Sequence, residues 1–156
     1  MQKTDKKSLQ DSLLSARQNT LKEANKHLTQ HEDFRGMKVY SWSGANINES
    51  LEAIQNLNNP LIWVMSSEME HDFNAERPWL NKEVEAVISF GKANKKLRRD
   101  LEGQLTFFTR KNNLLEACEI LSAVAHEGNS VFFSPGNGKN NKALEQEFLA
   151  YLKENK

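Results

Sequence analysis

The sequence has few of the residues that mark several classes of protein. Cys118 is the single cysteine in 156 residues, which excludes an intrachain disulfide framework and a multi-cysteine zinc site. The 21 basic and 21 acidic residues give a formal net charge of zero, so no basic excess favours nucleic acid. The longest apolar run, residues 60–65, is too short to cross a bilayer, and no apolar signal core follows the first residues. We therefore expect a cytoplasmic protein that binds neither nucleic acid nor membrane.

The first 35 residues differ from the rest of the chain. They contain no proline and no glycine, and apolar residues recur at helical spacing over residues 8–29. This pattern predicts an N-terminal helical arm over residues 1–35, followed by a domain over residues 36–156. An apolar stripe on a polar helix suits packing against the chain's own sheet, against a protein partner or against a second copy of the chain.

Short apolar runs alternate with helical segments from residue 36 onward. Strands are predicted at 37–42, 61–65, 86–90, 105–108 and 130–133, and helices at 48–57, 77–82, 93–102, 114–126 and 139–154. Such alternation is typical of a mainly parallel sheet with right-handed crossovers. Adjacent Phe132 and Phe133 indicate a strand covered on both faces. We predict an α/β, Rossmann-like sheet of about five to six strands with helices on both faces.

A ligand crevice is expected beyond the carboxyl ends of the parallel strands. Small polar residues follow each predicted strand, and the loop at 134–141 adds two glycines ahead of the last helix. Backbone amides at the start of that helix predict a site for a small anion, whereas a tight turn would need the same residues. The predicted ligand-binding residues are Ser43, Asn46, Ser67, Ser134, Gly136, Asn137, Gly138 and Lys139.

Three groups of charged or titratable residues are compatible with a functional site, but each has a simpler structural interpretation. The acidic residues and the histidine within 68–72 point in alternate directions in an extended loop, which favours a solvated loop over a metal site. His27 and His31 have the i,i+4 spacing of a helical metal pair, yet no third ligand is identifiable, which favours two exposed histidines. The basic residues within 95–99 are interpreted as a solvated helix face.

Two single residues raise the same choice between chemistry and packing. Cys118 lies in an apolar helical pattern, which favours a small core residue over a nucleophile. Trp42 ends a predicted strand, where its indole could fill the crevice or stack on a flat ligand. Filling is the preferred interpretation.

Five blocks of the sequence occur in the order found in a known family. Residues 39–46 are similar to a strand followed by Asp-Ser-Lys-Ala-Thr-Asn, and residues 62–73 to a strand, a Gly-Gly-Asp-x-Lys loop and Asp-Phe. The other blocks are 51–54, similar to Thr-x-x-Ala-Leu, 87–91, similar to a third strand, and 130–135, similar to a strand ending in Leu-Ser-Pro. In these blocks the chain from residue 37 onward resembles the C-terminal domain of the Mur ligases, most closely the ligase that adds D-glutamate to UDP-N-acetylmuramoyl-L-alanine. The resemblance implies a Rossmann-like fold and a relation to peptidoglycan synthesis.

The resemblance breaks at the positions that carry the family's function. Glu70 stands where the family has the lysine that helps to hold the incoming amino acid, and Gly44 replaces the lysine of the first loop. Ser66-Ser67 replaces the paired glycines, and residues 136–139 replace Ala-Cys-Ala-Ser. A carboxylate at residue 70 repels an acidic substrate. Gly138-Lys139-Asn140 also lacks the upstream glycine and the Ser or Thr of a phosphate-binding P-loop.

These observations predict a stand-alone, non-catalytic binding or scaffolding domain, a pseudoenzyme with no catalytic residues, no metal and no cofactor. The alternative is the substrate-binding part of an ATP-dependent ligase whose nucleotide-binding domain is on another chain. Glu70 discriminates between them, because a site for an acidic substrate excludes a carboxylate there. A nucleotide-binding module is a third alternative, but it needs a glycine fingerprint after the first strand, where residues 43–46 supply one glycine.

Overall fold

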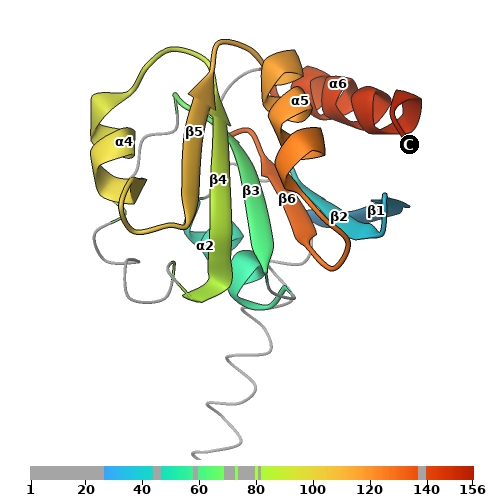
Figure 1. Cartoon of the computed structure of the whole chain (residues 1–156), viewed down its shortest axis with the longest axis horizontal. Coiled ribbons are helices and arrows are strands. Elements are labelled where there is room, and N and C mark those ends of the chain that lie inside the picture. Colours follow the sequence, from blue (N-terminus) through green and yellow to red (C-terminus); the bar gives the residue numbers. More distant parts are fainter. Residues whose placement is uncertain are drawn as a thin grey trace, which may run out of the picture.

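A computed structural model of the chain describes residues 27–43, 47–57, 60–68, 73, 80, 82–136 and 140–156. Within these residues six strands form one sheet in the order β1-β2-β6-β3-β4-β5 (Figure 1). The strands are β1 (Leu28–Phe34), β2 (Met37–Trp42), β3 (Leu61–Ser66), β4 (Val84–Phe90), β5 (Phe107–Lys111) and β6 (Ser130–Ser134). The helices are α2 (Ile47–Gln55), α4 (Lys95–Leu101), α5 (Leu114–Val124) and α6 (Asn141–Glu154).

The predicted fold class is confirmed. Strands β2, β6, β3, β4 and β5 are parallel to one another, and only β1 is antiparallel to its neighbour. Helices α2 and α4 pack on one face, and α5 and α6 on the other. None of the helices within the described ranges is long and apolar enough to cross a membrane.

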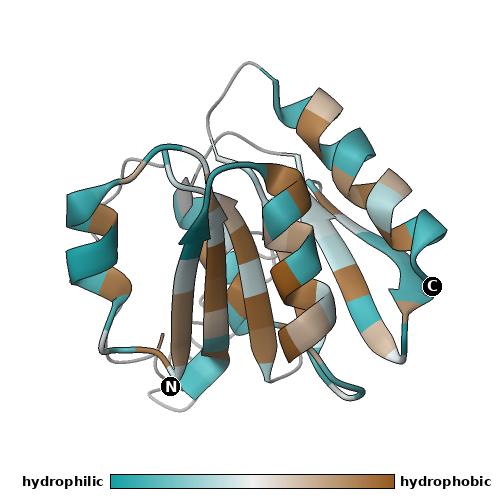
Figure 2. Ribbon diagram, turned by 45° about the horizontal axis from the view of Figure 1, so that its top comes forward, coloured by the Kyte–Doolittle hydropathy of each residue, from teal (hydrophilic) through white to brown (hydrophobic). Residues whose placement is uncertain are grey.

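Each face of the sheet has its own apolar core. Phe132 belongs to the core under α2 and α4, whereas the adjacent Phe133 belongs to the core under α5 and α6. Phe133 stacks on Phe148 of α6 with ring centroids 4.4 Å apart and planes 7° apart. Figure 2 shows the consequence, since apolar segments fill the central strands and polar segments lie on the outward faces of the helices. The strand at 130–134 is therefore covered on both faces, as its adjacent phenylalanines predicted.

The first strand corrects the predicted helical arm. Residues 28–34 were expected to end the arm, but they form β1, which pairs with β2 from Leu28↔Trp42 to Phe34↔Met37. Arg35 and Gly36 form the connection with φ values of 51° and 84°, and two successive positive φ angles are what a type I′ hairpin turn requires. The polar sequence of β1 resembled a helix end because an edge strand needs few apolar residues. The remaining part of the predicted arm, residues 1–26, lies outside the described residues.

Several predicted boundaries shift by one to three residues, and one prediction stays open. The strand expected at 105–108 begins at Phe107 and extends to Lys111, and the helix expected from residue 139 begins at Asn141. Asn94 and Asn113 start α4 and α5, because their side chains accept hydrogen bonds from the Leu97 and Glu116 amides at 3.1 and 2.9 Å. Most of the helix predicted at 77–82 lies outside the described residues.

The order of the strands produces a change of direction at β6. The chain runs from β2 to β3, β4 and β5 in one direction, with α2 and α4 on one face, and then returns through α5 on the other face to insert β6 between β2 and β3. After β6 the chain continues into α6 on that second face. Connections therefore leave β6 and its two neighbours on opposite faces, and in open α/β sheets this arrangement is where a ligand crevice is expected.

Candidate functional site

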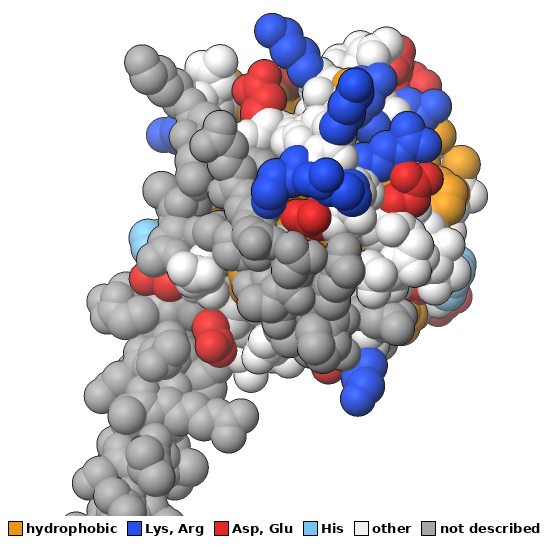
Figure 3. Space-filling model, turned by 90° about the vertical axis from the view of Figure 1, so that its left-hand side faces the viewer, with side chains coloured by type: hydrophobic (Ala, Val, Ile, Leu, Met, Phe, Trp, Pro, Cys, Tyr) orange, Lys and Arg blue, Asp and Glu red, His pale blue; other side chains and the backbone are white. Residues whose placement is uncertain are grey.

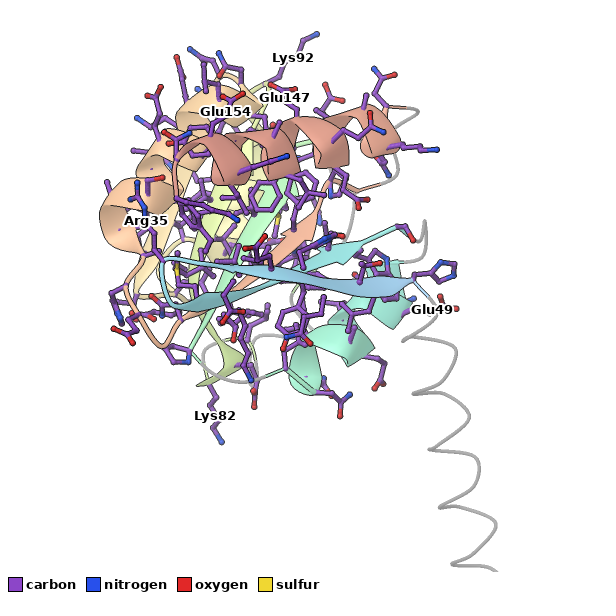
Figure 4. All side chains as sticks on the ribbon, turned by 90° about the vertical axis from the view of Figure 1, so that its right-hand side faces the viewer. Arg35, Glu49, Lys82, Lys92, Glu147 and Glu154 are labelled. Atoms are coloured by element: carbon purple, nitrogen blue, oxygen red, sulfur yellow. The ribbon has the colours of Figure 1, made fainter. Side chains whose placement is uncertain are left out.

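The carboxyl ends of the parallel strands meet at one edge of the molecule. Lys82 precedes β4 and Lys92 follows it, and Figure 4 shows these two side chains at opposite ends of the sheet. The exits of β2, β6, β3, β4 and β5 are therefore on the Lys92 side. The predicted crevice belongs to this edge, and so does a cavity beside the ends of β4 and β5.

The exits of β3 and β4 are tied together by side chains that bind backbone groups. The Ser67 hydroxyl donates to the Lys92 carbonyl at 2.5 Å, and the Asn94 side-chain amide donates to the Ser67 carbonyl at 2.9 Å. The Ser67 amide also donates to the Phe90 carbonyl at 2.8 Å. Ser67 is 1% exposed. Its hydroxyl therefore acts as a structural link between two strand ends.

Gly91 makes this close approach possible. Its φ is +114°, in the region that favours glycine, and a Cβ atom built on it would lie 2.8 Å from Ser67 Oγ. The Gly91 carbonyl accepts a hydrogen bond from Arg110 Nη1 at 2.7 Å, and the Gly91 amide donates to the Lys111 carbonyl at 2.9 Å. The end of β4 is thus held from β3 on one side and from β5 on the other.

The predicted ligand-binding residues that fall within the described ranges have defined positions. Ser43 is exposed, and its hydroxyl donates to the His27 carbonyl at 3.2 Å. Ser134 is 2% exposed at the end of β6. Gly136 is buried with φ +101°, and its carbonyl accepts a hydrogen bond from the Asn141 side chain.

The other predicted site residues cannot be positioned. Asn46, Asn137, Gly138 and Lys139 lie outside the described residues, as does Glu70. The anion site at the start of the last helix therefore stays a prediction. The structure does show that α6 begins without a side-chain cap, and that Asn141 Oδ1 is buried without a hydrogen-bond partner among the described residues.

A cavity of about 400 Å³ lies beside the ends of β4 and β5, against α4. Its walls include Asn94, Lys95, Leu97 and Arg98 from α4 and its cap, and Phe108 and Arg110 from β5. Arg98 is paired with Glu102, with Nε 2.6 Å from Oε2. That hydrogen bond raises the pKa of the Arg98 guanidinium and lowers the pKa of the Glu102 carboxyl.

The basic residues of α4 lie on a solvent-exposed helix face, as predicted, since Lys95, Lys96, Arg98 and Arg99 are all exposed. Lys95 and Arg98 also line the cavity, while Lys96 pairs with Asp100 at 3.3 Å. Arg110, which lies just beyond the strand predicted at 105–108, was not among the predicted ligand-binding residues. The sequence does place an arginine at a strand exit and a cluster of basic residues on the preceding helix. It does not show that β5 pairs with β4, which is what brings these residues to one cavity.

The predicted placement of the histidines is wrong. His27 and His31 are not exposed residues near the end of a helix, because His31 lies in β1, His27 precedes it and both are half-buried. His31 Nε2 lies 2.6 Å from the Ser41 hydroxyl, whereas the His27 ring contacts Trp42 edge-on with centroids 5.4 Å apart. No group of three potential metal ligands occurs within the described ranges, of which Glu68 is the one member of the 68–72 run.

Two packing interpretations are confirmed. Trp42 is 2% exposed and belongs to the core under α2 and α4, so its indole fills that region. Cys118 is 1% exposed in the opposite core. Burial raises the pKa of its thiol to about 12, which keeps the thiol protonated and unreactive near neutral pH.

Comparison with known proteins supports the fold and leaves the family open. No family model matches the chain, and no curated protein matches it. Among solved structures, it is similar to a domain from Haemophilus ducreyi of a protein assigned as a UDP-N-acetylmuramate:L-alanyl-γ-D-glutamyl-meso-diaminopimelate ligase, with a TM-score of 0.51 and 11% identity over 80% of this chain and 98% of that one. It also matches MurF from Acinetobacter baumannii, with a TM-score of 0.49 and 13% identity over 78% of this chain and 30% of that one. The chain therefore has the fold of a Mur ligase domain.

Proposed function

We propose that this chain is a binding or scaffolding domain that has kept the fold of a Mur ligase domain without catalytic activity of its own. One observation carries the proposal, which is that the Ser67 hydroxyl is buried and donates to the Lys92 carbonyl. A group used in this way is unavailable to a substrate. The proposed role is thus that of a pseudoenzyme related to the enzymes of peptidoglycan synthesis.

Two further features support this proposal. The β2 exit is occupied by the buried Trp42 indole, which reduces the space for a substrate on that side of β6. Glu70 stands where the resemblance implies a substrate-binding lysine, and a negative charge disfavours a carboxylate substrate. Catalysis requires groups that converge on one reachable point, and the replacement at residue 70 removes one of the groups that the resemblance implies for substrate binding.

The direct test is an assay of the full chain for ligation. The purified chain is mixed with ATP and with UDP-N-acetylmuramate and L-alanyl-γ-D-glutamyl-meso-diaminopimelate, the two compounds in the name of the Haemophilus ducreyi protein. A parallel reaction contains UDP-N-acetylmuramoyl-L-alanine and D-glutamate. We expect no phosphate release and no ligated product by mass spectrometry. Product formation by this chain alone would contradict the proposal.

The alternative role, as one part of a ligase shared between two chains, gives a different result in the same assay. Product would then form only when a separate ATP-binding chain is added, and a Ser43→Ala variant would lose it. If neither condition gives product, while the chain co-purifies with a defined protein partner, the scaffolding role is supported.

The partner contact is proposed to involve the part of the predicted apolar stripe that lies outside the described residues, residues 8–26. Leu14 and Leu21 belong to that stripe by their spacing of seven. Changing both to Glu should abolish self-association or partner binding in light scattering or pull-down experiments, while Gln18→Glu in the same segment should not. Equal association of both variants would contradict this assignment.

A further inference from the structure

The cavity between α4 and β5 carries an inference that does not depend on the proposed function. Its walls contain three cations, Lys95, Arg98 and Arg110, and one carboxylate, Glu102. Arg98 and Glu102 neutralise each other through hydrogen bonds of 2.6 and 3.4 Å. Within the described part of the chain, no carboxylate lies at ion-pair distance from Lys95 or Arg110. The cavity is therefore lined by two positive charges that the described residues leave uncompensated.

The Arg110 guanidinium is held in position by neutral groups. Its Nη1 donates to the Gly91 carbonyl at 2.7 Å and to Asn112 Oδ1 at 3.2 Å. These bonds use only Nη1, so the structure shows no acceptor for Nε and Nη2 among the described residues. Nε and Nη2 form one edge of the planar guanidinium, which matches two oxygens of a carboxylate or a phosphate. A donor pair fixed in advance lowers the entropy lost on binding.

The same cavity has an apolar wall. Leu97 is 3% exposed and Phe108 is partly buried, and both residues line the cavity with Ala93. A volume of about 400 Å³ falls in the range of small-molecule sites, which is about 300–1,000 Å³. An apolar wall beside fixed cationic donors suits a ligand that has an anionic group at one end and an apolar group at the other.

The surrounding surface is also positive. Figure 3 shows Lys and Arg side chains gathered on the side of the molecule that carries α4. Arg99 of α4 and Lys111 of β5 add to the lining cations, while Lys96 of α4 is paired with Asp100. Their combined field raises the local concentration of anions and the rate at which they associate.

We propose that this cavity binds a small organic anion that carries a carboxylate or a phosphate beside an aromatic or short aliphatic group. Arg110 holds the anionic group, Lys95 adds a second positive charge, and Phe108 with Leu97 contacts the apolar part. The site differs from the predicted anion site at the start of the last helix, because that loop follows β6 and this cavity lies by β5.

The test is a titration of the full chain, labelled with ¹⁵N, with phenyl phosphate. We expect amide shifts concentrated at residues 93–98 and 108–111. Inorganic phosphate and phenol, each of which has only one half of the ligand chemistry, should bind about tenfold more weakly or worse. Benzoate replaces the phosphate by a carboxylate, so its affinity relative to phenyl phosphate identifies which anion the site prefers.

Matched variants identify which side chains contribute to the affinity for phenyl phosphate. Arg110→Gln should weaken phenyl phosphate binding about tenfold or more, because it removes the charged donor pair. Lys95→Gln should weaken it several-fold without affecting folding, since no hydrogen bond or ion pair of Lys95 is seen among the described residues. Arg99→Gln removes an exposed charge from the same helix outside the cavity and should change the affinity by less than about twofold.

Three results would overturn the proposal. They are the absence of shifts at 93–98 and 108–111 at the solubility limit of phenyl phosphate, shifts confined to another region such as 134–141, and equal affinities of the Lys95→Gln and Arg99→Gln variants. Ligase activity in the assay above would contradict the proposed function but leave this outcome unchanged. The two proposals therefore fail separately.

Discussion

Ser41 and Glu145 join the sheet to its last helix, since the Ser41 hydroxyl of β2 donates to Glu145 Oε1 of α6 at 3.1 Å. His31 of β1 contacts the same hydroxyl, with Nε2 at 2.6 Å, and this Nε2 also lies 4.0 Å from Glu145 Oε1. A hydroxyl has one proton to give, so when Ser41 donates to Glu145 it accepts a hydrogen bond from His31. Ser41 is 1% exposed, which shields this chain of bonds from water. The hairpin of β1 and β2 is thus fastened to α6 by polar contacts as well as by apolar packing.

The first prediction concerns this contact. In a double-mutant cycle of Ser41→Ala and Glu145→Ala, we expect a coupling of about 1 kcal/mol in the free energy of unfolding, because each variant removes the same bond. Urea unfolding measures it. Glu147→Ala changes an exposed glutamate of the same helix, which Figure 4 shows pointing away from the sheet, and should cost less than about 0.5 kcal/mol. A coupling near zero would show that the contact between Ser41 and Glu145 does not contribute to the free energy of unfolding.

The second prediction compares two leucines of α5. Leu121 is fully buried in the core under α5 and α6, whereas Leu115 is 52% exposed. Leu121→Ala should lower the free energy of unfolding by about 2–5 kcal/mol through lost burial and the cavity it leaves. Leu115→Ala should change it by about 0.5 kcal/mol or less. Urea unfolding of both variants gives the comparison, and similar costs would mean that α5 packs through a different face.

The third prediction concerns Gly91. Alanine there meets both a positive φ and Ser67 Oγ at 2.8 Å, whereas alanine at Gly103, with φ +88°, meets no atom within 4 Å. We expect Gly91→Ala to destabilise the protein by about 1 kcal/mol more than Gly103→Ala, because overpacking adds to the backbone strain. Thermal or urea unfolding of the two variants measures the difference.

A second substitution tests the cause of that difference. In a Ser67→Ala background the clashing oxygen is absent, so the excess cost of Gly91→Ala over Gly103→Ala should shrink. An unchanged excess would assign the whole effect to the backbone of residue 91.

The fourth prediction follows from the raised pKa of Cys118, about 12. In the folded protein the thiol should resist a thiol-specific reagent at pH 8, and it should react at once when the chain is unfolded in urea. Rapid labelling without denaturant would contradict its burial in the core.

The raised pKa of Cys118 also makes the free energy of unfolding depend on pH. Above the ordinary thiol pKa of 9.0 the unfolded chain releases a proton that the folded chain keeps up to about pH 12. The folded state thus binds more protons than the unfolded state, so the Cys118 contribution to stability falls as the pH rises through this interval and is constant below it. Cys118→Ala removes this dependence, and the difference between the two unfolding curves isolates it from lysine and tyrosine ionisation.

Hydrophobic patterning predicted the parallel strands and their helices well because a doubly covered strand is almost wholly apolar. The run SVFFS of β6 has all five residues buried. The strand β1 was assigned to a helix because its sequence, LTQHEDF, contributes only Phe34 as a fully buried side chain. The Arg35-Gly36 pair was the one local sign of a hairpin, since glycine tolerates the positive φ that the turn requires.

The candidate cavity was beyond prediction for a different reason. Its cations come from α4 and β5, and they share one cavity only because β5 pairs with β4 at the outer end of the sheet. The sequence gives the residues of each element but not the order of the strands, which depends on how the crossovers pack. The roles assigned to Ser43 and Ser134 stay predictions, and for Ser67 the burial of its hydroxyl indicates a structural role.

The position of β6 has a consequence for how the protein is made. Lys38 pairs with Ser130, and Leu61 pairs with the same residue from the other side, so β6, which follows the other five described strands in the sequence, is the one that joins the two halves of the sheet. A nascent chain that ends before residue 130 has a β1-β2 hairpin and a β3-β4-β5 sheet with no strand between them. On the ribosome, both inner edges would stay open until residue 134 has emerged, and this is the interval in which a chaperone would be needed most.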